Sequence, residues 1–142
     1  MTSASSRNDL SAILRDKRDA VRYEVGNAGF RGRTTVEVRG DASVEARFER
    51  GEATDTYRMQ LSPAELDQLR QVLRDSDLAS LKSQRATAQP DEDRVHITLV
   101  ARASRTEATL WYNEQWTNPA LRALITAFTD LASRASGGKI SY

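Results

Sequence analysis

The chain has 142 residues, of which 39% are hydrophobic and 29% charged, and its formal net charge is +1. This length supports one sizeable hydrophobic core, and the composition is that of a folded globular protein, which excludes wholesale disorder. The chain contains neither cysteine nor an apolar run near the roughly 20 residues that cross a bilayer, so disulfides, thiolate chemistry and a membrane span are excluded, and we expect a cytoplasmic protein.

The first 19 residues are expected to be a flexible N-terminus followed by a short amphipathic helix. Asn8 can cap this helix, and Leu10, Ile13 and Leu14 follow the i, i+3, i+4 spacing of one helical face. The stripe is narrow, so the helix either docks on the core or offers its face to a partner. Residues 20–136 are predicted to form a single domain.

Four strands are predicted next, because apolar and polar residues alternate with a period of two. The segments are 21–25, 34–39, 44–49 and 57–61. A period of two places successive side chains on opposite faces of a strand, which indicates half-buried antiparallel strands. Gly40-Asp41-Ala42 and Gly51-Glu52 separate consecutive segments at hairpin distances.

A capping box at Ser62-Pro63-Ala64-Glu65 marks the start of a helix with leucines along one face. The polar stretch 82–93 follows, and a loop of that length is usually either functional or mobile. Alternation then predicts strands over 95–101 and 108–112. Asn118-Pro119 starts a last helix that Gly137-Gly138 ends, and residues 137–142 are expected to be a frayed tail.

The predicted fold is therefore α+β, with the element order α-β-β-β-β-α-β-β-α. We expect an antiparallel sheet of about six strands with the two main helices packed on one face. The opposite face is predicted to be polar and either in water or covered by something outside this chain. Its predicted side chains are those of Arg22, Glu24, Glu37, Arg39, Glu45, Arg47, Arg58, His96 and Trp111.

The residues argue against catalysis and against a bound cofactor or metal. His96 is the only histidine, and its strand phase places it on the charged face without a second imidazole. The acidic run Asp91–Asp93 lacks the glycine turn of a calcium loop, so we interpret it as a charged loop. Residues 26–33 hold three glycines and two arginines, but strands on both sides exclude a P-loop. We predict that the protein is not an enzyme.

The segment Gly29-Phe30-Arg31-Gly32-Arg33 is the first candidate for partner binding. An exposed aromatic flanked by arginine is typical of an interface anchor. The alternative is that Phe30 folds back onto the sheet edge. In the second aromatic group, Tyr112 has the core phase and Trp116 can pack at the start of the last helix, which leaves Trp111 as the second candidate.

Arginine supplies 18 of the 21 basic residues, which raises the possibility of nucleic-acid binding. Acidic residues are interleaved with it, however, as in residues 15–19 and 45–50. Counterion release requires positive charge that its own neighbours have not neutralised. The pattern favours solvated faces, and nucleic acid is the weaker partner hypothesis.

The run from Val21 to about Arg134 resembles the emfourin-type domains of bacteria. The resemblance rests on Tyr23, the turn at 29–32, the strand start at 43–45 and three longer segments; these are Leu61-Ser62-Pro63-Ala64-Glu65-Leu66, Arg94-Val95-His96-Ile97-Thr98-Leu99-Val100 and Pro119-Ala120-Leu121-Arg122-Ala123-Leu124. It implies a non-catalytic protein that inhibits a thermolysin-like metalloprotease. The leading helix and the long loop after Leu81 depart from the family pattern.

Three hypotheses follow from the sequence. The first is a protein-interaction domain, with protease inhibition as the version that the resemblance implies. The second is a homo-oligomer formed through the leading helix or the outer sheet face. The third is a nucleic-acid binder that uses Arg31, Arg33 and the outer arginines.

Overall fold

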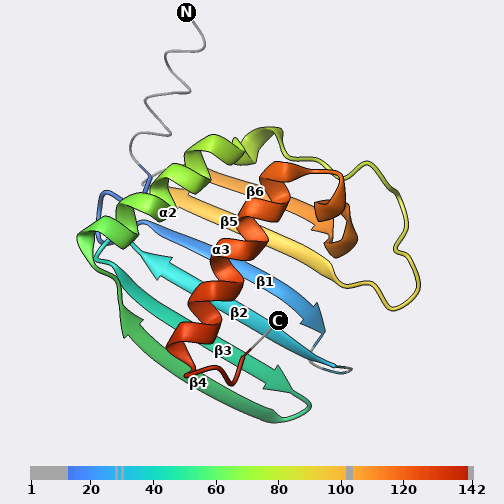
Figure 1. The fold of residues 1–142 in the computed structure, drawn as a ribbon, viewed down its shortest axis with the longest axis horizontal. Coiled ribbons are helices and arrows are strands. Elements are labelled where there is room, and N and C mark those ends of the chain that lie inside the picture. Colours follow the sequence, from blue (N-terminus) through green and yellow to red (C-terminus); the bar gives the residue numbers. More distant parts are fainter. Residues whose placement is uncertain (1–12, 28, 30, 102–103, 141–142) are drawn as a thin grey trace, which may run out of the picture.

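Six antiparallel strands form one open sheet in the order β4-β3-β2-β1-β5-β6 (Figure 1). The computed structural model of the chain describes residues 13–27, 29, 31–101 and 104–140. The predicted α+β class and six-stranded antiparallel sheet are confirmed. The strands are β1 (Ala20–Asn27), β2 (Gly32–Arg39), β3 (Ser43–Arg50), β4 (Ala53–Gln60), β5 (Arg94–Ala101) and β6 (Ser104–Trp111).

Both long helices cross the same face of the sheet, as predicted (Figure 1). They are α2 (Pro63–Ser76) and α3 (Pro119–Ala135), and two short 3-10 helices, η1 (Leu78–Ser80) and η2 (Tyr112–Trp116), follow α2 and β6. The capping box is formed: Ser62 Oγ accepts from the Glu65 amide at 3.2 Å, and Glu65 Oε1 accepts from the Ser62 amide at 3.0 Å. These bonds satisfy amides that the helix itself leaves unpaired.

The core lies between the helices and the apolar face of the sheet. Tyr23 of β1 stacks on Phe128 of α3, with ring centroids 5.0 Å apart and planes inclined by 5°. Burial of each large apolar side chain stabilises the fold by roughly 1.5–3 kcal/mol. The predicted strand phases are confirmed, because the side chains predicted to face inward on the two central strands are buried; they are Val21, Tyr23, Val25, Val36 and Val38.

The segment before β1 is fastened to α2. Ile13 and Leu14 are buried, and their carbonyl oxygens accept from Arg70 Nε at 3.1 Å and from the second Arg70 guanidinium nitrogen at 2.7 Å. These two residues therefore dock on the core, which was one of the two predicted alternatives. Leu14 has a left-handed backbone with φ of 54° and is not helical. Asn8 and Leu10 of the predicted helix lie outside the described residues.

The predicted end of the last strand and the predicted frayed tail were wrong. Tyr112 was predicted to continue the last strand, but β6 ends at Trp111 and Tyr112 begins η2. The tail was expected to fray after Gly137, yet Ile140 is buried and its amide donates to Ser136 Oγ at 2.8 Å. Ile140 belongs to the hydrophobic core, and the Gly138 amide also donates to the Ser133 carbonyl oxygen, so the tail folds back through residue 140.

Candidate functional site

The two predicted binding segments lie at the same end of the sheet. Pairing of Val25 with Val95 brings the β1–β2 turn close to the start of β5, and Arg94 at that start pairs with Trp111 at the end of β6. We call this region the loop end; it comprises the β1–β2 turn, residues 82–93 and η2. Phe30, the proposed anchor of the first segment, lies outside the described residues.

Within the first segment, Gly29 is exposed, whereas Gly32 and Arg33 have structural roles. Gly32 is buried with φ of 113°, and a Cβ added there would lie 2.3 Å from the ring of Phe48. Only glycine fits this backbone and this close approach. The Arg33 guanidinium makes an ion pair with Glu49 on β3 at 2.8 Å.

Arg31 connects the β1–β2 turn to residues 82–93. Its guanidinium donates to the carbonyl oxygen of Asp91 and lies 3.7 Å from a carboxylate oxygen of Asp93. The turn and the long loop, about 60 residues apart in the chain, are therefore in direct contact. Sequence reasoning placed Arg31 in a binding site, and the structure places it between two loops.

The long loop is held by a buried carboxylate, that of Glu92. Its side chain is 0% exposed and takes two bonds from the Arg85 guanidinium, at 2.8 and 2.6 Å. The backbone amides of Gln89 and Asn113 also donate to it, at 2.8 and 2.7 Å. These bonds, the Arg85 pair foremost, lower the pKa of Glu92 to about 2.

A second buried carboxylate, that of Glu114 in η2, holds the start of the loop. It accepts from the Ser83 hydroxyl at 2.6 Å and from the backbone amides of Gln84 and Trp111 at 2.7 and 2.9 Å. Burial alone would raise the pKa of Glu114, but these hydrogen bonds outweigh it and the pKa is lowered. We interpreted residues 91–93 as a charged loop. That interpretation did not anticipate that the Glu92 and Glu114 carboxylates bind the long loop to η2.

Trp111 is half-buried beneath this loop. Its indole nitrogen donates to the Arg85 carbonyl oxygen at 3.2 Å, and the Arg94 guanidinium lies 4.8 Å from its ring centre. The tryptophan that faces solvent is instead Trp116, which is 63% exposed and has Arg122 5.3 Å from its ring centre. The predicted contact of Trp116 with the start of α3 is present, through Arg122 in the first turn, but it leaves most of the indole exposed.

The outer face of the sheet, opposite to the helices, carries side chains that pair with each other. Charged members of the predicted set lie there, with pairs such as Arg22–Glu24 at 2.8 Å. The expectation that this face is in water or covered by something outside the chain was wrong for Trp111, because the chain's own loop 82–93 covers it.

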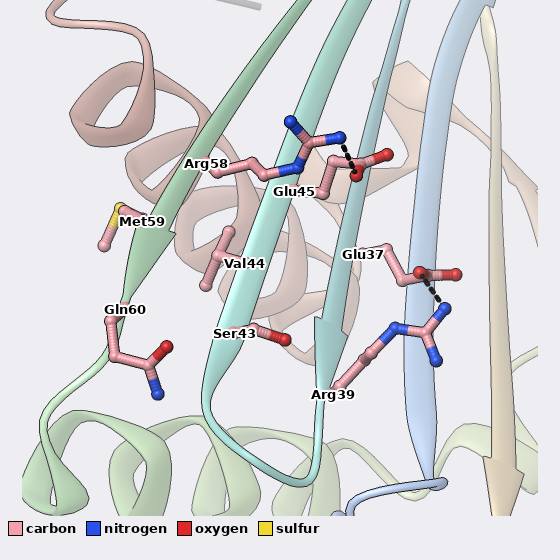
Figure 2. Close-up of a pocket in the computed structure, with 8 residues that line it drawn as sticks. All are labelled: Glu37, Arg39, Ser43, Val44, Glu45, Arg58, Met59 and Gln60. Atoms are coloured by element: carbon pink, nitrogen blue, oxygen red, sulfur yellow. Dashed lines mark hydrogen bonds and ion pairs between the residues drawn. The ribbon is translucent and has the colours of Figure 1, made fainter.

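A hollow of about 470 Å³ is lined by residues of β2, β3 and β4. Figure 2 shows two ion pairs beside it, Arg58 with Glu45 and Arg39 with Glu37. The arginine and glutamate charges cancel locally.

His96 also lies on the outer face, between Thr109 and Glu107. Its Nδ1 is 2.6 Å from Thr109 Oγ1, and its Nε2 is 3.4 Å from a Glu107 carboxylate oxygen. All three side chains stand on β5 and the edge strand β6. In the part of the chain that the structure describes, no group of three or more acidic or histidine side chains could hold a metal ion.

Neither the comparison with protein-family models nor the comparison with curated proteins finds a match to this chain. The resemblance to emfourin-type domains therefore stays a hypothesis that rests on the sequence segments above. No helix within the described ranges is long and apolar enough to cross a membrane.

Proposed function

We propose that this chain is a non-catalytic protein-binding domain whose contact surface is the loop end. The observation that carries the proposal is Trp116, a large aromatic side chain 63% exposed on a segment that is otherwise firmly held. Tryptophan and arginine are the residues most enriched where binding energy concentrates in interfaces.

The surface around Trp116 is preorganised. Glu114, two residues earlier in η2, is buried and bound by three donors from the long loop and the end of β6. A loop that is already ordered loses little conformational freedom on binding, so more of the contact energy contributes to affinity. The ordered structure therefore favours a preformed binding surface over a loop that becomes ordered only when the partner binds.

Among the described residues of the loop end, reactive groups do not gather in one place. Its buried carboxylates, Glu92 and Glu114, are both occupied by internal donors, and His96 stands apart from them on the outer face. A general acid or base needs hydrogen-bond access to a substrate. The arrangement supports binding rather than catalysis.

Affinity capture from cells of the natural source tests the proposal. The tagged protein is expected to retain a partner in stoichiometric amount, and Trp116→Ser is expected to lose it. Arg58→Gln, which changes an exposed side chain of the outer face, is the matched control and should retain the partner. Recovery of no stoichiometric partner, or equal recovery by all three proteins, contradicts the proposal.

The narrower version, inhibition of a thermolysin-like metalloprotease, follows from the resemblance to emfourin-type domains. It predicts that an excess of the protein slows peptide hydrolysis by such an enzyme. Unchanged hydrolysis would remove this version and leave the binding domain in place.

A further inference from the structure

The strand β4 leaves one edge of the sheet open (Figure 1). It is the first strand in the order β4-β3-β2-β1-β5-β6, and among the described residues no strand pairs with its outer side. All eight of its residues pair with β3 in one unbroken register. Edge strands are usually protected by proline, lysine, a bulge or a covering element. The sequence of β4 contains neither proline nor lysine, and its residues are exposed or half-buried.

The free edge of β4 presents the backbone groups of Thr54, Thr56 and Arg58. Just beyond the strand, the Leu61 amide donates to the Ala42 carbonyl oxygen at 2.9 Å, which continues the pairing of β4 with β3. Successive residues of an antiparallel strand direct their N–H and C=O groups to opposite sides, so the odd-numbered residues of β4 bond to β3. The even-numbered residues direct theirs outward, where a further strand can bond to them.

The opposite edge of the sheet, β6, is partly closed by the chain itself. The Trp111 amide at the end of β6 donates to the buried Glu114 carboxylate at 2.9 Å, and η2 follows directly. A strand that binds this molecule by backbone hydrogen bonds therefore has its longest free edge in β4.

Two copies of β4 can pair with each other about a two-fold axis perpendicular to the sheet. Such an axis makes the two strands antiparallel and keeps the helices of both copies on the same side of the joined sheet. Each copy then uses the same edge, as a two-fold interface requires. The residue of β4 that lies on the axis opposes itself, and its position decides which other residues lie opposite each other.

The charges of the outer face favour an axis at Thr56. With this axis, Arg58 opposes Thr54 of the second copy, and Thr54 pairs with Glu49 on β3 of that copy. Arg58 already lies 3.2 Å from Glu45 of its own chain. In the dimer it therefore lies between two glutamates, one from each copy. Such exposed pairs add little affinity, but they select one register over another.

The neighbouring axes bring like charges together. An axis at Asp55 places the two Asp55 carboxylates opposite each other. An axis at Tyr57 places Arg58 opposite Thr56 of the second copy, which pairs with Arg47 on β3. Like charges in neighbouring positions across strands are destabilising. The register with Thr56 on the axis avoids both contacts.

We propose that the free edge of β4 binds β4 of a second copy of this chain, antiparallel, with Thr56 on the two-fold axis. This self-association goes beyond the proposed function and uses a different surface from the loop end. The sequence suggested the leading helix or the outer face for a homo-oligomer, and the strand edge is neither. One strand pair is a small contact beside the roughly 800 Å² per partner of a long-lived interface, so we expect a dimer that dissociates on dilution.

Light scattering over a dilution series tests the dimer. The unchanged protein is expected to approach twice the monomer mass at high concentration. Thr56→Lys brings two ammonium groups together at the axis and should raise the dimer dissociation constant about tenfold or more. Thr126→Lys, at an exposed position of α3, is the matched control and should change it less than about twofold. Trp116→Ser at the loop end should also leave the dimer unchanged.

Cysteine substitution tests the register, because the chain contains no cysteine. In the proposed dimer the two copies of residue 56 lie about 5.5 Å apart, whereas the two copies of residue 54 lie about 14 Å apart. A short bismaleimide should therefore cross-link Thr56→Cys much faster than Thr54→Cys. Both variants replace an exposed threonine on the same edge, so their thiols are matched in access to the reagent.

Three outcomes overturn the inference. They are an unchanged protein that stays monomeric at the highest concentration, equal dissociation constants for Thr56→Lys and Thr126→Lys, and equal cross-linking rates for the two cysteine variants. Thermal unfolding of every variant checks that these exposed substitutions leave the fold intact. Capture of another protein through Trp116 does not depend on any of these results, so the proposed function is tested separately.

Discussion

Arginine–glutamate ion pairs occur both on the outer face and at the loop end, but the glutamate is partly exposed on the outer face and buried at the loop end. On the outer face, Arg58 and Glu45 meet at 3.2 Å with the arginine side chain 75% exposed. At the loop end, Arg85 and Glu92 meet at 2.6 Å with the glutamate side chain 0% exposed. Water screens the first pair and is excluded from the second. Burial of the carboxylate, more than the length of the ion pair, therefore distinguishes the glutamates that hold a loop in place from those that do not.

The largest expected effect comes from Glu92→Gln. The amide cannot accept the paired bonds of Arg85 as a carboxylate does, and it leaves a partly buried guanidinium without its counter-charge. We expect a loss of about 3 kcal/mol in the free energy of unfolding, measured by urea denaturation. Glu45→Gln on the outer face is the control, with a loss below about 0.5 kcal/mol. Equal losses of unfolding free energy in the two variants would contradict the difference between the two regions.

Acid should release the long loop before the strands separate. The folded state holds the pKa of Glu92 at about 2, against an ordinary value of 4.5. A lowered folded pKa contributes stability that is complete above the ordinary value and is lost as the pH falls toward 2. In a Trp116→Phe variant, Trp111 is the remaining tryptophan, and its fluorescence should change between these pH values.

Far-ultraviolet circular dichroism recorded in parallel separates loop release from global unfolding. Addition of Glu92→Gln to the Trp116→Phe variant should flatten the acid transition of Trp111. A Trp111 signal that does not change across this range would show that the Glu92 carboxylate does not hold the loop.

A smaller effect is expected from Trp111→Phe. Phenylalanine keeps most of the ring packing but loses the indole hydrogen bond to the Arg85 carbonyl oxygen, which contributes about 1 kcal/mol. Amide hydrogen exchange should accelerate in residues 83–92 while that of β1 and β2 stays the same. Uniform acceleration across the sheet would indicate a general loss of stability instead.

The smallest effect is expected from Arg58→Gln. Its partner Glu45 is partly exposed and also lies 3.8 Å from Arg47, so removal of one arginine changes stability by less than about 0.5 kcal/mol. Differential scanning calorimetry at low and high salt should give nearly the same shift relative to the unchanged protein. A loss above about 1 kcal/mol would show that the outer face is a cooperative network.

The sheet could be predicted because its signals are local. Alternation over segments such as 21–25 follows from the two faces of a strand, and the Ser62–Glu65 capping box joins residues three positions apart. Each feature depends on residues only a few positions apart. Alternation predicted the correct strand phases, and the capping box predicted the correct start of α2.

The loop end could not be predicted because its partners are distant in the sequence. Glu114 binds Ser83 across 31 positions, and no periodicity relates the two. The outward turn of Trp116 depends on η2, a short 3-10 helix that resembles a strand end in the sequence. The acidic run Asp91–Asp93 was the available signal, but such a run is equally typical of a solvated loop.

The hydrogen bonds that hold the two ends of the long loop leave a short stretch of exposed residues between them. On its N-terminal side Ser83 and Arg85 donate to Glu114 and Glu92, and on its C-terminal side the Gln89 amide donates to Glu92, while Ala86, Thr87 and Ala88 are exposed. Lengthening a closed loop at such a place adds little entropic cost. This stretch is therefore a natural point for insertion of an epitope or a fluorescent label into the folded protein.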